Sequence, residues 1–377
     1  MRFGFHLSPL TGMLLDRSNR RIYFLIPYPP GSAPGQRFRF EQYLGLLAAN
    51  GNSIKLFPFL TTETYKILYR PGNYYQKIAG VLRGFMKRLI SLPQLLQGHF
   101  IFVFREATPI GPPFMEWLIA RLFRKKIIYD FDDAIWMPNT SVENRIISRL
   151  KWHSKVKSIC RWSYRVSCGN EFLAGFAREL NGSVVVNPTT IDTEKQHNPS
   201  LYPPGKESQT FKAGWTGTHS TLFYLNPLLP VFESLHKKYP QFRIVIIADR
   251  KPNWNLPCLE FIQWDKSTEV EDLLKFDIGI MPLTEDPWSM GKCGFKALQY
   301  MSLEIPALVS PVGINAKIVD HGIHGFHCAS MEEWYQYIEY LIVNKNECPR
   351  LGKRGREKVI AHYSVGSNAA TFLALFE

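Results

Sequence analysis

The chain alternates short apolar runs with longer amphipathic stretches. Apolar runs of about four to eight residues bounded by turn residues are typical of buried strands, and apolar positions three and four apart are typical of helices. In the first half this pattern predicts strands at Arg21–Pro27, Ser53–Phe57, Phe100–Phe104, Lys126–Tyr129, Arg165–Cys168 and Ser183–Val186. It predicts helices at about Arg37–Asn50, Tyr75–Leu96, Pro113–Phe123, Val142–Ser163 and Glu171–Leu180.

The second half repeats the alternation. Strands are expected at Phe211–Trp215, Arg243–Ala248, Leu259–Gln263, Ile278–Pro282, Ala307–Ser310 and His327–Cys328. Helices are expected at Thr221–Tyr239, Ser267–Phe276, Gly294–Ser302, Asn315–Val319, Met331–Asn344 and Glu347–His362. Strands that alternate with helices indicate an α/β fold with parallel sheets.

A linker is predicted between the halves, because Asn187–Gln209 combines four Pro and one Gly with many polar residues. We therefore expect two doubly wound, Rossmann-like domains, 1–195 and 206–362, facing each other across a cleft. A last helix in 363–377 is expected to cross back to the first domain. Ligands of such folds bind beyond the carboxyl ends of the strands.

Composition narrows the class of protein. With 45% hydrophobic and 20% charged residues, the chain is neither disordered nor fibrous. Its net charge of +13 comes from the first half, where residues 1–190 hold 26 Lys and Arg against 11 Asp and Glu. Such a basic half indicates an anionic partner: nucleic acid, an acidic membrane surface or a phosphorylated ligand.

The cysteines and the apolar runs indicate a cytosolic chain. The six cysteines form no Cys-x-x-Cys pair, so we expect reduced thiols that hold no metal. No apolar run approaches the ~18 residues of a membrane span. Residues 1–20 lack the pattern of a secretory signal.

The stretch Asp277–Gly313 offers a candidate phosphate site. A buried strand leads through a polar loop into a helix opened by Gly294, whose free N–H groups can bind phosphate. Lys292 and Lys296 add positive charge at that helix start, and Gln299 could hydrogen-bond a sugar hydroxyl. An ordinary strand–helix unit with solvated lysines would show the same spacing.

Several segments together resemble the GT-B glycosyltransferases, in particular the retaining enzymes of glycosyltransferase family 4. In chain order these are Pro27–Leu44, Val184–Asp192, Cys293–Pro306, Ser310–Gly313, Val319–Phe326 and Gly355–Ser364. The family's Glu-x7-Glu pair falls on Gly291 and Gln299. Its phosphate-binding Arg and Lys have no counterpart in Gly214–Thr221.

The resemblance implies a nucleotide-sugar donor as co-substrate, with no cofactor and no metal. Lys292, Lys296 and the amides of Gly294 and Phe295 would bind the diphosphate, and Gln299 the ribose. Further donor-site positions implied by the resemblance are Gly35, Arg37 and Gly217. Lys292 would also assist catalysis, and the sugar would be transferred with retention of configuration.

Three carboxylates follow the strand at 126–129, namely Asp130, Asp132 and Asp133. An Asp-x-Asp pair binds divalent cations in GT-A transferases and supplies the nucleophile of haloacid-dehalogenase phosphatases. The GT-B resemblance instead places Asp132 near the reacting carbon, where the family has His, and Asp133 at the position of the family's acid. A helix N-cap with a buried ion pair is the structural alternative.

Residues Lys77–Leu96 form a candidate interfacial helix. Ile78, Val81, Leu82, Phe85, Met86, Leu89 and Ile90 recur at helical spacing. The opposite face carries Lys77, Arg83, Lys87 and Arg88 and no acid. A core helix would show the same stripe, but the basic face favours docking on an anionic inner membrane leaflet.

The sequence therefore predicts a cytoplasmic, peripheral-membrane glycosyltransferase of the hexosyltransferase type. It would transfer sugar to a glycan or lipid-linked acceptor in cell-surface polysaccharide synthesis. A nucleic-acid-binding protein that uses the basic half is the first alternative, although no helix-turn-helix or RNA-binding motif is present and we expect no nucleic-acid partner. A catalytically silent family member is the second.

Overall fold

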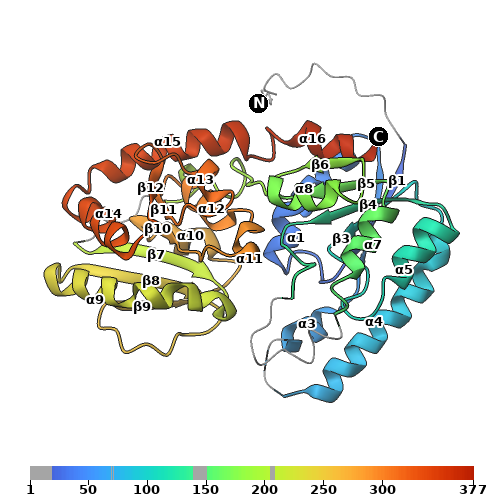
Figure 1. The fold of residues 1–377 in the computed structure, drawn as a ribbon, viewed down its shortest axis with the longest axis horizontal. Coiled ribbons are helices and arrows are strands. Elements are labelled where there is room, and N and C mark those ends of the chain that lie inside the picture. The colour runs from blue at the N-terminus through green and yellow to red at the C-terminus, as the bar shows by residue number, and fades with distance from the viewer. Residues whose placement is uncertain (1–18, 69, 71, 139–150, 204–208) are drawn as a thin grey trace, which may run out of the picture. The chain divides into compact units, whose positions relative to one another are not determined.

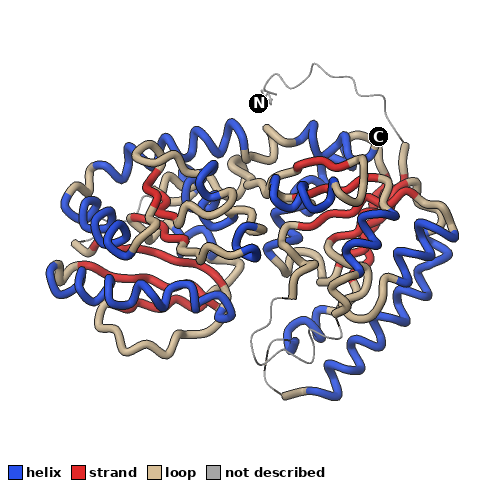
Figure 2. The backbone as a smooth tube through the Cα atoms, viewed as in Figure 1, coloured by secondary structure: helices blue, strands red, loops and turns tan. Residues whose placement is uncertain are grey.

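The computed structural model describes residues 19–68, 70, 72–138, 151–203 and 209–377. Its strands form two six-stranded sheets with the orders β2-β1-β3-β4-β5-β6 and β12-β11-β10-β7-β8-β9 (Figures 1 and 2). The first contains β1 (Arg21–Ile26), β2 (Ser53–Pro58), β3 (Phe100–Phe104), β4 (Lys126–Phe131), β5 (Arg165–Cys168) and β6 (Val184–Val186). The second contains β7 (Phe211–Gly217), β8 (Phe242–Ala248), β9 (Leu259–Gln263), β10 (Ile278–Met281), β11 (Ala307–Val309) and β12 (Gly325–His327).

Helices connect the strands, as a parallel arrangement requires. In the first half they are α1 (Pro34–Arg39), α2 (Leu44–Ala49), α3 (Thr62–Leu68), α4 (Tyr74–Leu95), α5 (Phe114–Trp117), α7 (Lys155–Trp162) and α8 (Glu171–Arg178). In the second half they are α9 (Leu229–Lys238), α10 (Glu269–Leu273), α11 (Pro287–Met290), α12 (Phe295–Ser302), α13 (Asn315–Ile318), α14 (Met331–Val343), α15 (Glu347–His362) and α16 (Ala369–Leu373). Tighter or wider turns form η1 (Glu41–Tyr43), the π-helical η2 (Leu118–Leu122), η4 (Pro199–Leu201), η5 (His219–Leu228) and η6 (Ala374–Phe376).

The predicted α/β class is confirmed, because both sheets are built of parallel neighbours such as β1 with β3 and β7 with β8. Three predicted helices are wrong in their continuity, and one of them, Pro113–Phe123, is split into α5 and η2. Thr221–Tyr239 is split into η5 and α9, since Pro227 and Pro230 each lack the N–H that a continuous helix needs. Arg37–Asn50 is split into α1, η1 and α2. The predicted helix Val142–Ser163 lies partly outside the described residues.

The chain divides into two compact units. Unit 1 comprises residues up to Tyr129 together with Trp162–Tyr164 and Phe376, and unit 2 comprises Asp130–Arg161, Arg165–Leu375 and Glu377. Each predicted domain, 1–195 and 206–362, contains the strands of one complete sheet.

Aromatic rings fill the core of unit 1. Phe24 of β1 packs against Phe40 and Phe102 at centroid distances of 5.3 and 4.9 Å. Phe376, the last residue of η6, packs against Phe24, Phe100 and Phe102. Strand β1 thus packs against a residue from the far end of the chain.

In unit 2, helix α12 packs closely against β10 and β11. Gly279 of β10 allows this approach, because a Cβ there would lie 2.2 Å from the ring of Tyr300. The Tyr300 hydroxyl accepts a hydrogen bond from the N–H of Thr216 in β7, at 3.2 Å. Helix α12 is therefore fixed to two neighbouring strands, with its N-terminus beyond their carboxyl ends.

Candidate functional site

The N-terminus of α12 is shaped by Gly294. This residue is the N-cap and has a φ of +67°, a conformation that side chains other than glycine rarely adopt. A Cβ at this position would also lie 2.1 Å from Cδ1 of Ile318. The left-handed φ and the packing of Ile318 against this position therefore both require glycine, and phosphate binding at this helix start stays a prediction.

Lys292 and Asp133 meet beside this helix start. Nζ of Lys292 donates to Oδ1 of Asp133 at 2.9 Å, and both side chains are mostly buried. The same ammonium group lies 5.1 Å from the ring centroid of Trp288. Two residues that the sequence analysis proposed for separate motifs are thus direct neighbours in unit 2.

Lys296 lies one turn further along, with Nζ 5.3 Å from the ring centroid of Trp215. Burial and, to a smaller extent, the charge of Lys292 lower the pKa of Lys296 to about 8, while Asp133 opposes the shift. We call Asp133, Trp215, Trp288, Lys292 and Lys296 the lysine cluster. It is a place where two cations lie close together and would gain from a bound anion.

Gly217 at the end of β7 contributes space to this cluster. A Cβ there would lie 2.4 Å from the Trp215 ring. Glycine therefore leaves room for the indole ring over which Nζ of Lys296 lies. The predicted donor-site position Gly217 therefore lies next to the cluster, with Trp215 between it and Lys296.

Asn170 holds the loop before α12 in place. Its Oδ1 accepts from the N–H of Leu173 at 2.9 Å and caps α8. Its Nδ2 donates to the carbonyl oxygens of Lys292 at 2.9 Å and Met290 at 3.3 Å. Sequence reasoning missed Asn170, Trp215 and Trp288. An Asn directly before a helix start indicates a cap, but nothing local indicates the second contact.

The three carboxylates after β4 have different surroundings. Asp130 is buried and its Oδ1 accepts a hydrogen bond from Oγ of Ser167 at 2.5 Å, so it belongs to the interior. The backbone oxygen of Asp132 lies 3.2 Å from Sγ of Cys293. Asp133 pairs with Lys292. Within the described part of the chain, no group of His, Cys, Asp and Glu side chains has the arrangement of a metal site.

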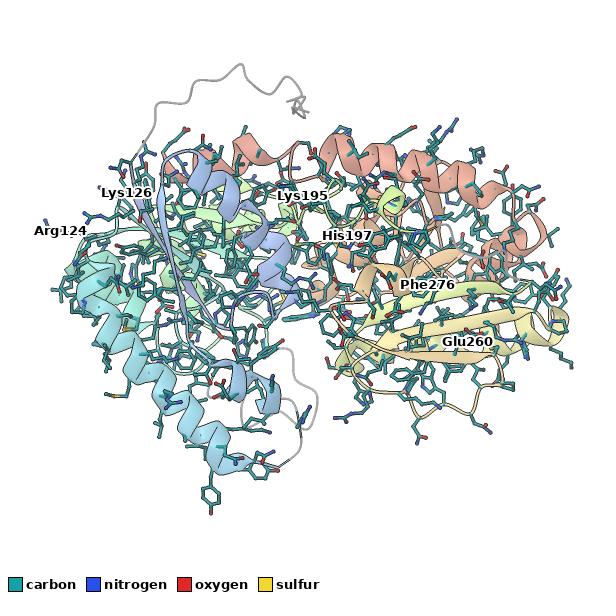
Figure 3. All side chains as sticks on the ribbon, turned by 180° about the vertical axis from the view of Figure 1, so that it is seen from behind. Arg124, Lys126, Lys195, His197, Glu260 and Phe276 are labelled. Atoms are coloured by element: carbon teal, nitrogen blue, oxygen red, sulfur yellow. The ribbon has the colours of Figure 1, made fainter. Side chains whose placement is uncertain are left out.

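Gln299 lies inside unit 2 and not at its surface. Its Nε2 is 3.3 Å from Nε2 of His197, a residue that Figure 3 labels. Arg356 donates to the carbonyl oxygen of His197 at 2.8 Å and so fixes the His197 segment. The predicted contact of Gln299 with ribose remains a prediction.

Gly35 and Arg37 belong to α1 in unit 1. Arg37 is buried, with its guanidinium carbon 4.9 Å from the ring centroid of Phe38. The lysine cluster lies in unit 2, so the predicted contribution of Gly35 and Arg37 to donor binding is untested.

Helix α4 is formed as predicted, but it exposes most of its large apolar side chains, whereas a core helix would bury them. Gly80, Gly84 and Arg88 are buried, whereas the apolar stripe faces outward. The exposed members are Tyr74, Tyr75, Ile78, Leu82, Met86, Leu89 and Ile90. The core-helix alternative is thus wrong for these side chains. No helix of the described residues has the length and apolar character needed to cross a membrane.

The predicted basic face is wrong for Arg88, because this side chain is buried. Its guanidinium donates to the carbonyl oxygens of Ala107, Phe57 and Ile26 at 2.7, 2.6 and 2.9 Å. Burial lowers the pKa of Arg88 to about 9, and the negative charge of Glu116 acts against this shift. Arg83 and Lys87 remain exposed.

Comparison with known proteins identifies the class. The family model described as Glycosyl transferases group 1 matches residues 224–358, which include the Trp288, Lys292 and Lys296 part of the cluster. A search of curated proteins finds no match. The match confirms the expected glycosyltransferase domain and enzyme class.

Solved structures share the fold along most of the chain. A sucrose-phosphate synthase from Thermosynechococcus elongatus has a TM-score of 0.66 at 14% identity over 95% of this chain and 98% of its own. A glycosyltransferase from Rickettsia africae has 0.65 at 13% identity over 95% and 98%. HepE from Anabaena, solved in complex with UDP-glucose, has 0.57 at 11% identity over 94% and 100%. The predicted GT-B fold is confirmed.

Proposed function

We propose that this protein transfers a sugar from a nucleotide-sugar donor to a glycan or lipid-linked acceptor, in the synthesis of cell-surface polysaccharide. The observation that carries the donor assignment is the lysine cluster at the start of α12, within the matched glycosyltransferase domain. The complex of HepE with UDP-glucose supports a donor of the same chemistry.

In this proposal the cluster binds the donor's diphosphate. Lys292 and Lys296 supply positive charge, and the backbone N–H groups of Gly294 and Phe295 donate to phosphate oxygens. When the glycosidic bond to phosphate breaks, negative charge grows on the leaving oxygen. Ammonium groups already in place stabilise that charge without reorganising. Lys292 thus assists catalysis through the leaving group.

Asp133 has a defined part beside Lys292. It neutralises Lys292 until the diphosphate arrives and competes with it for the ammonium group. Asp132, its neighbour, is proposed to lie near the reacting sugar carbon. As the family 4 resemblance implies, the reaction would retain the donor's configuration and need no metal.

The acceptor side is proposed to operate at a membrane. Helix α4 exposes apolar side chains, with Tyr75 at 90% and Ile90 at 73% accessibility. Arg83 and Lys87 lie exposed on the same helix. Exposed apolar area beside basic residues suits the surface of an anionic bilayer, where each cation contributes about 1 kcal/mol. A lipid-linked acceptor would be presented there.

Donor screening tests the enzymatic proposal. Calorimetry and hydrolysis assays with UDP-, GDP- and ADP-linked sugars should show binding and slow hydrolysis for one nucleotide class. Lys292→Met should abolish most of both, whereas the exposed Lys353→Met, which makes the same change of charge, should not. Absence of binding by the wild-type protein to every nucleotide sugar would refute the proposed function.

Sedimentation with phosphatidylglycerol vesicles tests the membrane proposal. Arg83→Glu combined with Lys87→Glu should release the protein from these vesicles, and high salt should weaken binding by the wild type. Reversal of two exposed lysines elsewhere, Lys237→Glu and Lys353→Glu, is the matched control. Wild-type protein that stays in the supernatant would contradict membrane docking.

A further inference from the structure

A second exposed apolar surface lies on the α5–η2 segment of unit 1. Phe114 is 54% exposed, Trp117 41% and Leu122 56%, and Phe123 is also exposed. The rings of Phe114 and Trp117 stack on each other with centroids 6.2 Å apart. We call these four side chains the α5 patch. Large apolar side chains gathered on one surface indicate an interaction site.

The exposed charges on the segment that carries the α5 patch are positive. Arg121, Arg124 and Lys126 are exposed, and Figure 3 shows Arg124 at the edge of the molecule. Glu116, the single acidic residue between Ala107 and Lys126, is buried. Its Oε1 accepts from the N–H of Ala107 at 2.8 Å. The patch therefore presents aromatic rings and cations to solvent without an opposing acid on its own segment.

Helix α4 and the α5–η2 segment are anchored at the same residue. Arg88 of α4 donates to the carbonyl oxygen of Ala107, and Glu116 of α5 accepts from its N–H. Arg88 and Glu116 also attract each other electrostatically. Because both helices are tied to Ala107, they keep a fixed relation to each other within unit 1.

We propose that the α5 patch is a second membrane contact, which inserts Phe114, Trp117 and Leu122 into the headgroup region of an anionic bilayer. Trp and other aromatic side chains favour this interfacial region, and the neighbouring cations match its negative potential. One helix alone would leave unit 1 able to roll about the helix axis. Two anchored contacts fix its orientation toward a lipid-linked acceptor. This inference rests on the membrane docking proposed above.

Environment-sensitive labels test the insertion directly. The six native cysteines are buried, so a cysteine introduced at the surface can be labelled selectively. A fluorophore on Leu122→Cys should shift to the blue and become shielded from iodide when phosphatidylglycerol vesicles are added. One on Met86→Cys of α4 should do the same. One on Ile360→Cys, an exposed apolar position of α15, should stay in water.

Truncating two aromatic side chains of the α5 patch measures how much the patch contributes to vesicle binding. Phe114→Ala with Trp117→Ala should weaken partitioning into these vesicles by about tenfold, the loss expected from two half-buried aromatic side chains. Phe223→Ala, an exposed aromatic residue of unit 2, should change it little. Circular dichroism of each variant establishes that it is folded.

The outcomes separate the two proposals. If the label at position 86 enters lipid while that at 122 stays in water, the α5 patch is not a membrane contact, and docking through α4 stands. If the wild type binds no vesicles, both proposals fail. A loss of self-association in the Phe114→Ala, Trp117→Ala variant with unchanged vesicle binding would assign the patch to a second copy of the chain instead.

Discussion

Lys292 and Lys296 carry the same charge but are held differently. Lys292 has a carboxylate partner, Asp133, whereas Lys296 lies over the ring of Trp215 and has a lowered pKa. Lys296 therefore gains more from an arriving anion, because a bound diphosphate would relieve the penalty of its burial.

The first prediction concerns the size of that gain. Lys296→Met should weaken binding of a nucleoside diphosphate by about 1.5–3 kcal/mol, the range for a hydrogen bond to a charged group. Titration calorimetry measures this difference as a Kd about 10- to 100-fold higher. Lys353→Met serves as the control. If wild type and Lys296→Met bind the nucleoside diphosphate with equal affinity, Lys296 does not contact it.

The second prediction concerns pH. The pKa of Lys296 is lowered to about 8, so its positive charge is present at pH 7 and lost as the pH rises through 8. Diphosphate affinity should therefore fall by up to about tenfold between pH 7 and 9. Lys296→Arg keeps its charge over this range and should flatten the profile. The same fall in Lys296→Arg would place the titrating group elsewhere.

At the scale of elements, α4 shows why the sequence pattern placed Arg88 on the wrong face. Gly80 and Gly84 let the helix lie close to Thr64 and Phe59, since a Cβ at either position would come within 2.3 and 2.6 Å of them. The buried face is therefore a narrow line of two glycines and Arg88. Periodicity reports where apolar residues recur, but it cannot show that the recurring stripe faces solvent.

The third prediction concerns Arg88, the buried cation of this face. Arg88→Met should lower the free energy of unfolding by about 3–5 kcal/mol, because three carbonyl oxygens lose their charged donor and Glu116 loses the attraction of the Arg88 charge. Arg83→Met, one turn away and exposed, should change it by less than about 0.5 kcal/mol. Urea unfolding compares the two. Similar values for both variants would mean that Arg88 is not a structural residue.

At the scale of the whole molecule, the sequence predicted the sheets better than the site. Strands in the described residues overlap predicted runs, because each is a local apolar segment. Lys292, Gly294 and Lys296 could be proposed together since they are neighbours in sequence. The contact from Lys292 to Asp133 joins residues 159 apart, and only the tertiary fold shows it.

The fourth prediction tests the reaction as a whole. If the two lysines and the helix start stabilise the leaving diphosphate, sugar transfer should proceed unchanged in excess EDTA. The measurement is the transfer rate with and without chelator, on protein whose nucleotide binding has been established. A rate abolished by EDTA and restored by Mn²⁺ would assign Asp132 and Asp133 to a metal-dependent reaction.

The aromatic contacts of Phe376 constrain how the protein is made. Arg20 donates to the carbonyl oxygen of Phe376, 356 residues later, and Phe24 and Phe102 pack against its ring. At a translation rate of about 5–20 residues per second, strand β1 leaves the ribosome roughly 20–70 s before this neighbour does. During that interval the aromatic surface of β1 and β3 lacks part of its cover and is available to chaperones. Unit 1 is therefore completed only after the strands β7 to β12 of unit 2 have been made.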